Sequence, residues 1–156
     1  MLEGYVIYCD DIRVEDNGKL MLIGVYGTDL IAQGEFPITL TQIQLLIRFR
    51  YTLEHCGKSL NINVYLPGDD ESTPSLVHGI NTAQKPSASQ LEGIKKAYAD
   101  GPVFANLSIP LGLSHIQVDE LGFIKVTLEC EGEVKRLNSL RINDTPALNS
   151  SDAPKD

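Results

Sequence analysis

Apolar and polar residues alternate along most of this chain, and turn residues close each alternating run. The clearest run extends from Ile43 to Tyr51, where every second residue is apolar and most intervening residues are polar. A period of two is typical of a strand with one buried face. A similar run, Leu60 to Leu66, follows a turn at Gly57, and we expect the two runs to pair as a hairpin.

Shorter runs of the same kind follow this pair, and turn residues separate them. They predict an edge strand at 76–80, strands at 103–109 and 114–118, and a last hairpin formed by 123–130 and 134–142. The pattern changes near 89–99, where Ser89 and Glu92 have capping-box spacing and apolar residues follow at helical intervals. This segment predicts one short helix.

These elements together indicate an all-β, mainly antiparallel fold. We expect eight or nine short strands in a two-sheet β-sandwich, Ig-like or related, with at most one short helix near 89–99. A partly closed β-barrel is the alternative, because the sequence does not say whether the sheet edges meet. We assign residues 1–142 to a single domain and 143–156, rich in Asn, Asp, Ser, Pro and Ala, to a disordered tail.

The first hairpin has a register that side-chain chemistry decides. Its two apolar runs meet at Asp16-Asn17-Gly18, and a three-residue loop with a left-handed glycine opposes Val14 to Leu20 and Glu15 to Lys19. A two-residue loop would instead pair charged residues with apolar ones. We therefore expect the three-residue loop, because one slip in register exchanges the two faces of a strand.

This register separates two neighbouring acids, Asp10 and Asp11. Asp10 stands opposite Gly24 on the apolar face, so we expect it to be partly buried and to accept hydrogen bonds as a structural polar group. Asp11 lies on the other face beside Arg13 and can pair with it. Asp11 and Arg13 are candidates for contacting a cation or a charged partner.

A second candidate surface is the polar face of the strand near residue 48. Arg48 and Arg50 place two positive charges there, on an otherwise acidic protein, with Leu46 between polar neighbours. A solvated face is the simplest interpretation. The alternative is a contact with the acidic loops of the same chain or of another subunit.

Charge and hydropathy exclude several classes of partner. The formal net charge is −8, from 21 acidic and 13 basic residues, which repels nucleic-acid phosphates and anionic membrane surfaces. No apolar run approaches the ~20 residues needed to span a bilayer, and the first residues lack a basic leader. The three cysteines show no CxxC spacing and are expected to be reduced. We expect a cytoplasmic protein that binds neither nucleic acid nor membrane.

No catalytic, cofactor-binding or metal-binding motif is visible. The three histidines lack ligand spacing, and His55 with Cys56 fits a turn better than a base beside a nucleophile. We therefore expect a non-enzymatic binding or structural domain, without cofactor, that contacts a protein partner or assembles with itself. One alternative is a small-ligand or cation-binding sandwich that uses acids of the first hairpin and of loop 67–74. Another is a hydrolase whose site is assembled only in space.

The opening hairpin resembles a family of small uncharacterised bacterial or phage domains that share DDIR, an acid, GK, and LIG followed by an aromatic residue. The matching segment is YCDDIRVEDNGKLMLIGVYG. The positions that carry the resemblance are Asp10, Asp11, Arg13, Glu15, Gly18, Lys19, Leu22, Ile23, Gly24 and Tyr26. The resemblance implies a β-rich fold and transfers no catalytic residue.

Overall fold

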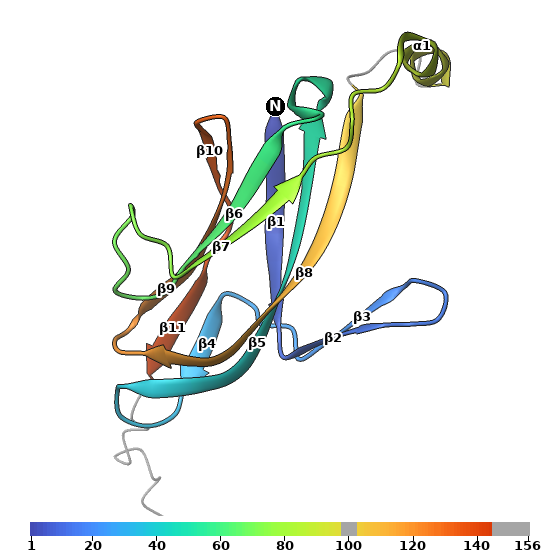
Figure 1. Ribbon diagram of the computed structural model, residues 1–156. Helices are drawn as coiled ribbons and strands as arrows, with labels where there is room; N and C mark the ends of the chain where they lie inside the picture. Colours follow the sequence, from blue (N-terminus) through green and yellow to red (C-terminus); the bar gives the residue numbers. More distant parts are fainter. Residues whose placement is uncertain (98–102, 145–156) are drawn as a thin grey trace, which may run out of the picture.

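The computed structural model describes residues 1–97 and 103–144, which form eleven strands, one 3-10 turn (η1) and one helix (Figure 1). Their bounds are β1 (Leu2–Cys9), β2 (Asp11–Val14), β3 (Leu20–Ile23), β4 (Asp29–Ala32), β5 (Ile38–Thr52), η1 (Leu53–His55), β6 (Ser59–Tyr65), β7 (Leu76–Asn81), α1 (Ala88–Ala97), β8 (Phe104–Val118), β9 (Gly122–Cys130), β10 (Glu133–Arg136) and β11 (Leu140–Asp144). Within the described residues, no helix is long and apolar enough to cross a membrane.

The strands form two packed sheets and one separate hairpin. The smaller sheet has the order β1-β5-β8, and the larger has the order β4-β11-β9-β6-β7, with β10 also paired to β9. All neighbouring strands are antiparallel except β4 and β11. This confirms the expected sandwich, with separate hydrogen-bonding ladders instead of a partly closed barrel.

The core lies between the two sheets, where the apolar faces of β5 and β6 both point inward. On β5 the side chains predicted to face inward are buried, with Ile43, Leu45 and Ile47 all at 0% exposure. Leu46, expected on the polar face, is also buried, at 2% exposure. On β6 the buried side chains include Leu60 and Ile62, both at 0%. Burial of each such side chain is worth roughly 1.5 to 3 kcal/mol, so this interface supplies much of the drive to fold.

The predicted hairpin between residues 43–51 and 60–66 is wrong. β5 pairs with β1 and β8, while β6 pairs with β7 and β9. The turn η1 carries the chain from one sheet to the other. Both runs present an apolar face, and in a sandwich two such faces can pack across the core instead of pairing edge to edge.

Three other boundaries differ from the sequence analysis. The strands expected at 103–109 and 114–118 are one continuous strand, β8, and the second strand of the last hairpin, expected at 134–142, is divided into β10 and β11. β11 includes residues 143–144, although composition predicts that the tail begins at 143. Residues 145–156 lie outside the described part of the chain. The expected short helix is α1.

The first hairpin has the predicted register. Val14 pairs with Leu20, and the amide of Glu15 donates to the carbonyl of Lys19 at 2.9 Å. Gly18 has φ +79°, the left-handed conformation that the three-residue loop requires. The hairpin forms its own two-stranded sheet, which we call the arm, and Figure 1 shows it projecting sideways from the sandwich.

The edge of the smaller sheet is joined to the larger sheet through one asparagine. The amide nitrogen of Val6 in β1 donates to Oδ1 of Asn138 at 2.7 Å, and Nδ2 of Asn138 donates to the carbonyl of Val6 at 2.8 Å. The hydroxyl of Tyr8 also donates to the backbone carbonyl of Asn138 at 3.0 Å. Asn138 lies between β10 and β11, so its side chain occupies the place of a neighbouring strand.

We expect Asn138→Ala to lower the free energy of unfolding by about 1 to 3 kcal/mol, because the backbone groups of Val6 lose both partners. The measurement is urea denaturation followed by circular dichroism. Asn106→Ala, at an exposed asparagine of β8, is the matched control and should change stability little. Equal stability of the two variants would show that Asn138 does not join the sheets.

Candidate functional site

The arm leaves the sandwich at Asp10, between β1 and β2. The backbone amide of Asp10 donates to the carbonyls of Ile23 and Gly24, at 3.0 and 3.2 Å. After the arm, the amide of Tyr26 donates to the carbonyl of Tyr8 at 2.9 Å. These bonds hold both strands of the arm at its base.

The carboxylate of Asp10 packs over this base. It accepts a 2.5 Å hydrogen bond from the hydroxyl of Tyr26, and a Cβ at Gly24 would lie 1.9 Å from its Oδ2 atom. Gly24 also has φ +64°, which an L side chain rarely adopts. Asp10 is exposed, so the expectation of partial burial is wrong. The arm projects from the core, and its base therefore faces solvent.

Asp11 and Arg13 lie together on the arm. Their side chains form a 2.9 Å ion pair, with exposures of 37% and 68%. Exposed pairs of this kind contribute little to stability, about 0 to 1 kcal/mol. Asp10 and Asp11 contact different partners, so the structure does not bring the two acids into one site.

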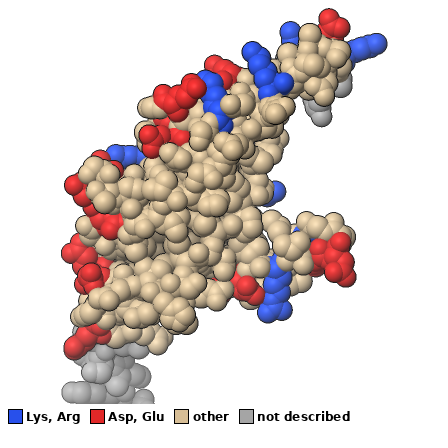
Figure 2. All heavy atoms as spheres, in the orientation of Figure 1, with Lys and Arg blue, Asp and Glu red and all other residues tan. Residues whose placement is uncertain are grey.

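The opposite face of the arm is apolar throughout. Ile12, Val14, Leu20 and Leu22 occupy it in two cross-strand pairs. Val14 is 68% exposed and Leu20 is 37% exposed. The sequence predicted these pairs, but their exposure follows only from the position of the arm, which stands clear of the body in Figure 2. Charged side chains gather near the end of the arm in that view.

Arg48 and Arg50 lie on the outer face of the smaller sheet. Arg50 pairs with Glu3 of β1 at 2.6 Å and its guanidinium lies 4.7 Å from the ring centroid of Phe104. Arg48 donates to Ser108 at 3.1 Å. These partners belong to the neighbouring strands, so the two arginines do not contact the acidic loops of the same chain. A contact with the loops of another subunit stays a prediction.

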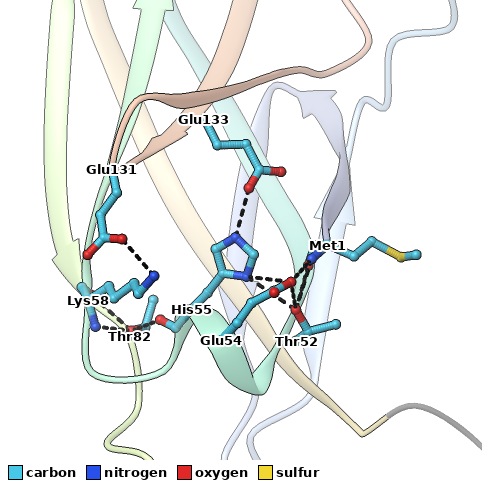
Figure 3. Close-up of polar contacts among 8 residues, drawn as sticks. All are labelled: Met1, Thr52, Glu54, His55, Lys58, Thr82, Glu131 and Glu133. Atoms are coloured by element: carbon cyan, nitrogen blue, oxygen red, sulfur yellow. Dashed lines mark hydrogen bonds and ion pairs between the residues drawn. The ribbon is translucent and has the colours of Figure 1, made fainter.

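A polar cluster that the sequence did not indicate lies around His55 (Figure 3). The His55 side chain is 5% exposed, and its Nε2 atom is 3.0 Å from Oε2 of Glu133. Its Nδ1 atom is 3.3 Å from the hydroxyl of Thr52. The same hydroxyl donates to Glu54 at 2.5 Å, and the amino group of Met1 contacts both residues.

The donors and acceptors of this cluster fit a structural clamp. The Nε2–H of His55 donates to Glu133, while the single hydroxyl hydrogen of Thr52 goes to Glu54, which leaves the Thr52 oxygen to accept from its other neighbours. Nearby, the Lys58 ammonium pairs with Glu131 at 2.6 Å. The His55–Glu133 and Lys58–Glu131 contacts join the segment between β5 and β6 to the turn after β9 and to the first residue of β10. A hydroxyl, an imidazole and a carboxylate are in contact in this cluster, and these are the groups that a hydrolase would use. The hydrolase alternative stays a prediction.

The titration of nearby groups follows from burial and hydrogen bonds. The hydrogen bond from the Met1 amino group lowers the pKa of Glu54 to about 2. Burial raises the pKa of the free thiols of Cys9 and Cys130, which favours their neutral forms. Among residues 1–97 and 103–144, no three or more His, Cys, Asp and Glu side chains are grouped so that they could hold a metal ion.

We expect Asp10→Asn to lower the pKa of Tyr26. Burial first, and then the hydrogen bond and charge of Asp10, raise this pKa from 10.0 to about 12. The folded state therefore gains stability from the protonated hydroxyl below pH 10 and loses it between pH 10 and 12. Ring-labelled NMR titration of Tyr26 measures the change. Asp11→Asn is the control, and an unchanged Tyr26 pKa in Asp10→Asn would contradict the contact.

Comparison with known proteins gives one result. The model of DUF6941, described as a family of unknown function, matches residues 4–143. No curated protein and no solved structure matches the chain. The match includes the arm and both sheets of the sandwich. Because it spans most of the 156 residues, the chain belongs to DUF6941, a family of unknown function.

Proposed function

We propose that this domain is a non-enzymatic binding module that contacts another protein surface through the apolar face of the arm. The observation that supports this function most directly is the exposure of Val14 and Leu20, at 68% and 37%, on a hairpin that projects from the sandwich. Contiguous apolar side chains in contact with water are unfavourable unless a partner covers them.

The shape of the arm fits a protein partner. An isolated two-stranded hairpin is only marginally stable in water, so contact with another protein would stabilise it. Glu15, Asp16 and Lys19 surround the tip, which gives the apolar face a charged rim. An apolar centre with a polar rim is the usual arrangement of protein interfaces. The partner is either a different protein or a second copy of this chain.

The cellular location is part of the same proposal. Cys9, Cys56 and Cys130 are free thiols, and free thiols are common where the environment is reducing. We place the protein in the cytoplasm, where the net charge of −8 disfavours contact with nucleic acid and anionic membranes.

We expect the double variant Val14→Thr with Leu20→Thr to weaken partner binding at least about tenfold, because the interface loses apolar area. Sedimentation velocity over a range of concentrations measures association with a second copy. Photo-cross-linking from position 12 in an extract of the native host, followed by mass spectrometry, identifies a different protein. Threonine, like valine, is β-branched and is enriched in strands, so the hairpin should remain folded.

Met21→Thr is the matched control, because Met21 lies on the opposite face of the arm and is 46% exposed. It should leave association unchanged. The proposal fails if the chain is monomeric at all concentrations and the double variant captures the same cross-linked proteins as the original chain.

A further inference from the structure

A groove of about 760 Å³ lies on the outer face of the larger sheet, away from the core. Its floor consists of the outward-facing residues of β6 and β9, which alternate with the buried core residues. The floor is a grid of three cross-strand pairs, namely Asn61 with Glu129, Asn63 with Thr127, and Tyr65 with Lys125.

One wall of the groove is a loop between β6 and β7 that is already ordered. Oδ2 of Asp69 accepts hydrogen bonds from the amide of Leu66 at 2.8 Å and from the amide and hydroxyl of Ser75, at 3.1 and 2.6 Å. The opposite wall is β10. Arg136 of β10 and Glu71 of the loop form a 2.9 Å pair between the two walls, with exposures of 75% and 73%. Such an exposed pair opens at little cost.

Polar groups on the floor lack partners. Thr127 is only 8% exposed, and its Oγ1 atom is buried without a hydrogen bond among the described residues. Unpaired buried hydroxyls are uncommon, because each costs about 1 to 3 kcal/mol. Asn63 uses one amide hydrogen on Glu129, at 3.2 Å, and keeps a second hydrogen and its carbonyl oxygen. Within residues 1–97 and 103–144, the Asn61 side chain has no hydrogen-bond partner.

The same chain shows what an asparagine of this kind can bind. Asn138 takes both the N–H and the C=O of Val6 in an extended strand, at 2.7 and 2.8 Å. Asn61 and Asn63 are two residues apart on one face of β6, so their spacing of about 6.5 to 7 Å equals the repeat of an extended peptide. An extended segment lying along β6 would therefore offer one peptide unit to each asparagine.

The charges along the groove specify the ligand further. Lys125 lies at one end of the grid and Glu129 at the other, four residues apart on β9. Lys125 has no ion-pair partner in the described part of the chain. An extended peptide with an acidic and a basic side chain four residues apart matches this separation of about 13 Å. Val77 and Val134, which are 57% and 56% exposed, line the groove and suit small apolar side chains between those charges.

The geometry points to a binding site for an extended peptide segment, held through its backbone by Asn61 and Asn63, with an acidic side chain at Lys125 and a basic one at Glu129. Thr127 supplies the third polar contact on the floor. This site is separate from the arm, so the inference does not depend on the proposed function.

The test uses a phage-displayed library of random dodecapeptides selected on the immobilised full chain. Enriched peptides are synthesised and titrated by isothermal calorimetry. We expect them to carry an acid and a base four positions apart. Asn61→Ala with Asn63→Ala should weaken their binding at least about tenfold, because two backbone contacts are lost. Thr127→Val should weaken binding while leaving the melting temperature unchanged or higher, because its hydroxyl has no partner in the free chain.

Two further variants make the outcome decisive. Lys125→Glu, at an exposed site, should enrich peptides with a base where the original chain selects an acid. Asn106→Ala, on the other sheet, should leave affinity unchanged. The inference is overturned if no peptide is enriched, if Lys125→Glu selects the same sequences, or if the same groove variants weaken binding of neutral oligosaccharides on a glycan array. Peptides lost only in the Val14→Thr, Leu20→Thr variant would belong to the arm and would also overturn it.

Discussion

The side chain of Asn138 joins the two packed sheets of the sandwich at one corner. β1 is the edge of the smaller sheet, and its free backbone groups would otherwise need water or another strand. The amide of Asn138 pairs with both backbone groups of Val6 and so connects this edge to the segment between β10 and β11. Tyr8 adds a second bond to the same place. These hydrogen bonds lie at the edge of the core, where the apolar faces of the two sheets pack against each other and exclude water.

Closing the core in this way decides which surfaces remain open. The chain leaves the smaller sheet at Asp10, so the arm that follows has no sheet beneath it, and its apolar face contacts solvent. On the larger sheet the inward face is filled, and the outward face carries the polar grid between the ordered loop and β10. The arm and the groove thus both follow from how the sheets pack. The arm offers exposed apolar side chains, whereas the groove offers asparagine side chains that can bind a peptide backbone.

The buried polar groups of the molecule divide into two kinds. His55 has partners on both ring nitrogens, and its neighbours join two turns, which fits a role in holding the fold. The Thr127 hydroxyl is also buried, but it has no hydrogen-bond partner among the described residues. A satisfied polar group stabilises its surroundings, whereas an unsatisfied one carries a cost that a ligand can remove. This contrast is the physical reason for assigning structure to the first cluster and recognition to the second.

The sequence by itself determined local features, because these depend on neighbours along the chain. It predicted the alternation of β5, the three-residue loop with Gly18, and the pairing of Asp11 with Arg13. Tertiary structure alone decided which strands pair, since residues 43–51 and 60–66 present similar apolar faces and only packing across the core separates them into two sheets. It also decided exposure. Whether Val14 is buried, or Thr127 lacks a partner, depends on groups far away in sequence, which periodicity cannot reveal.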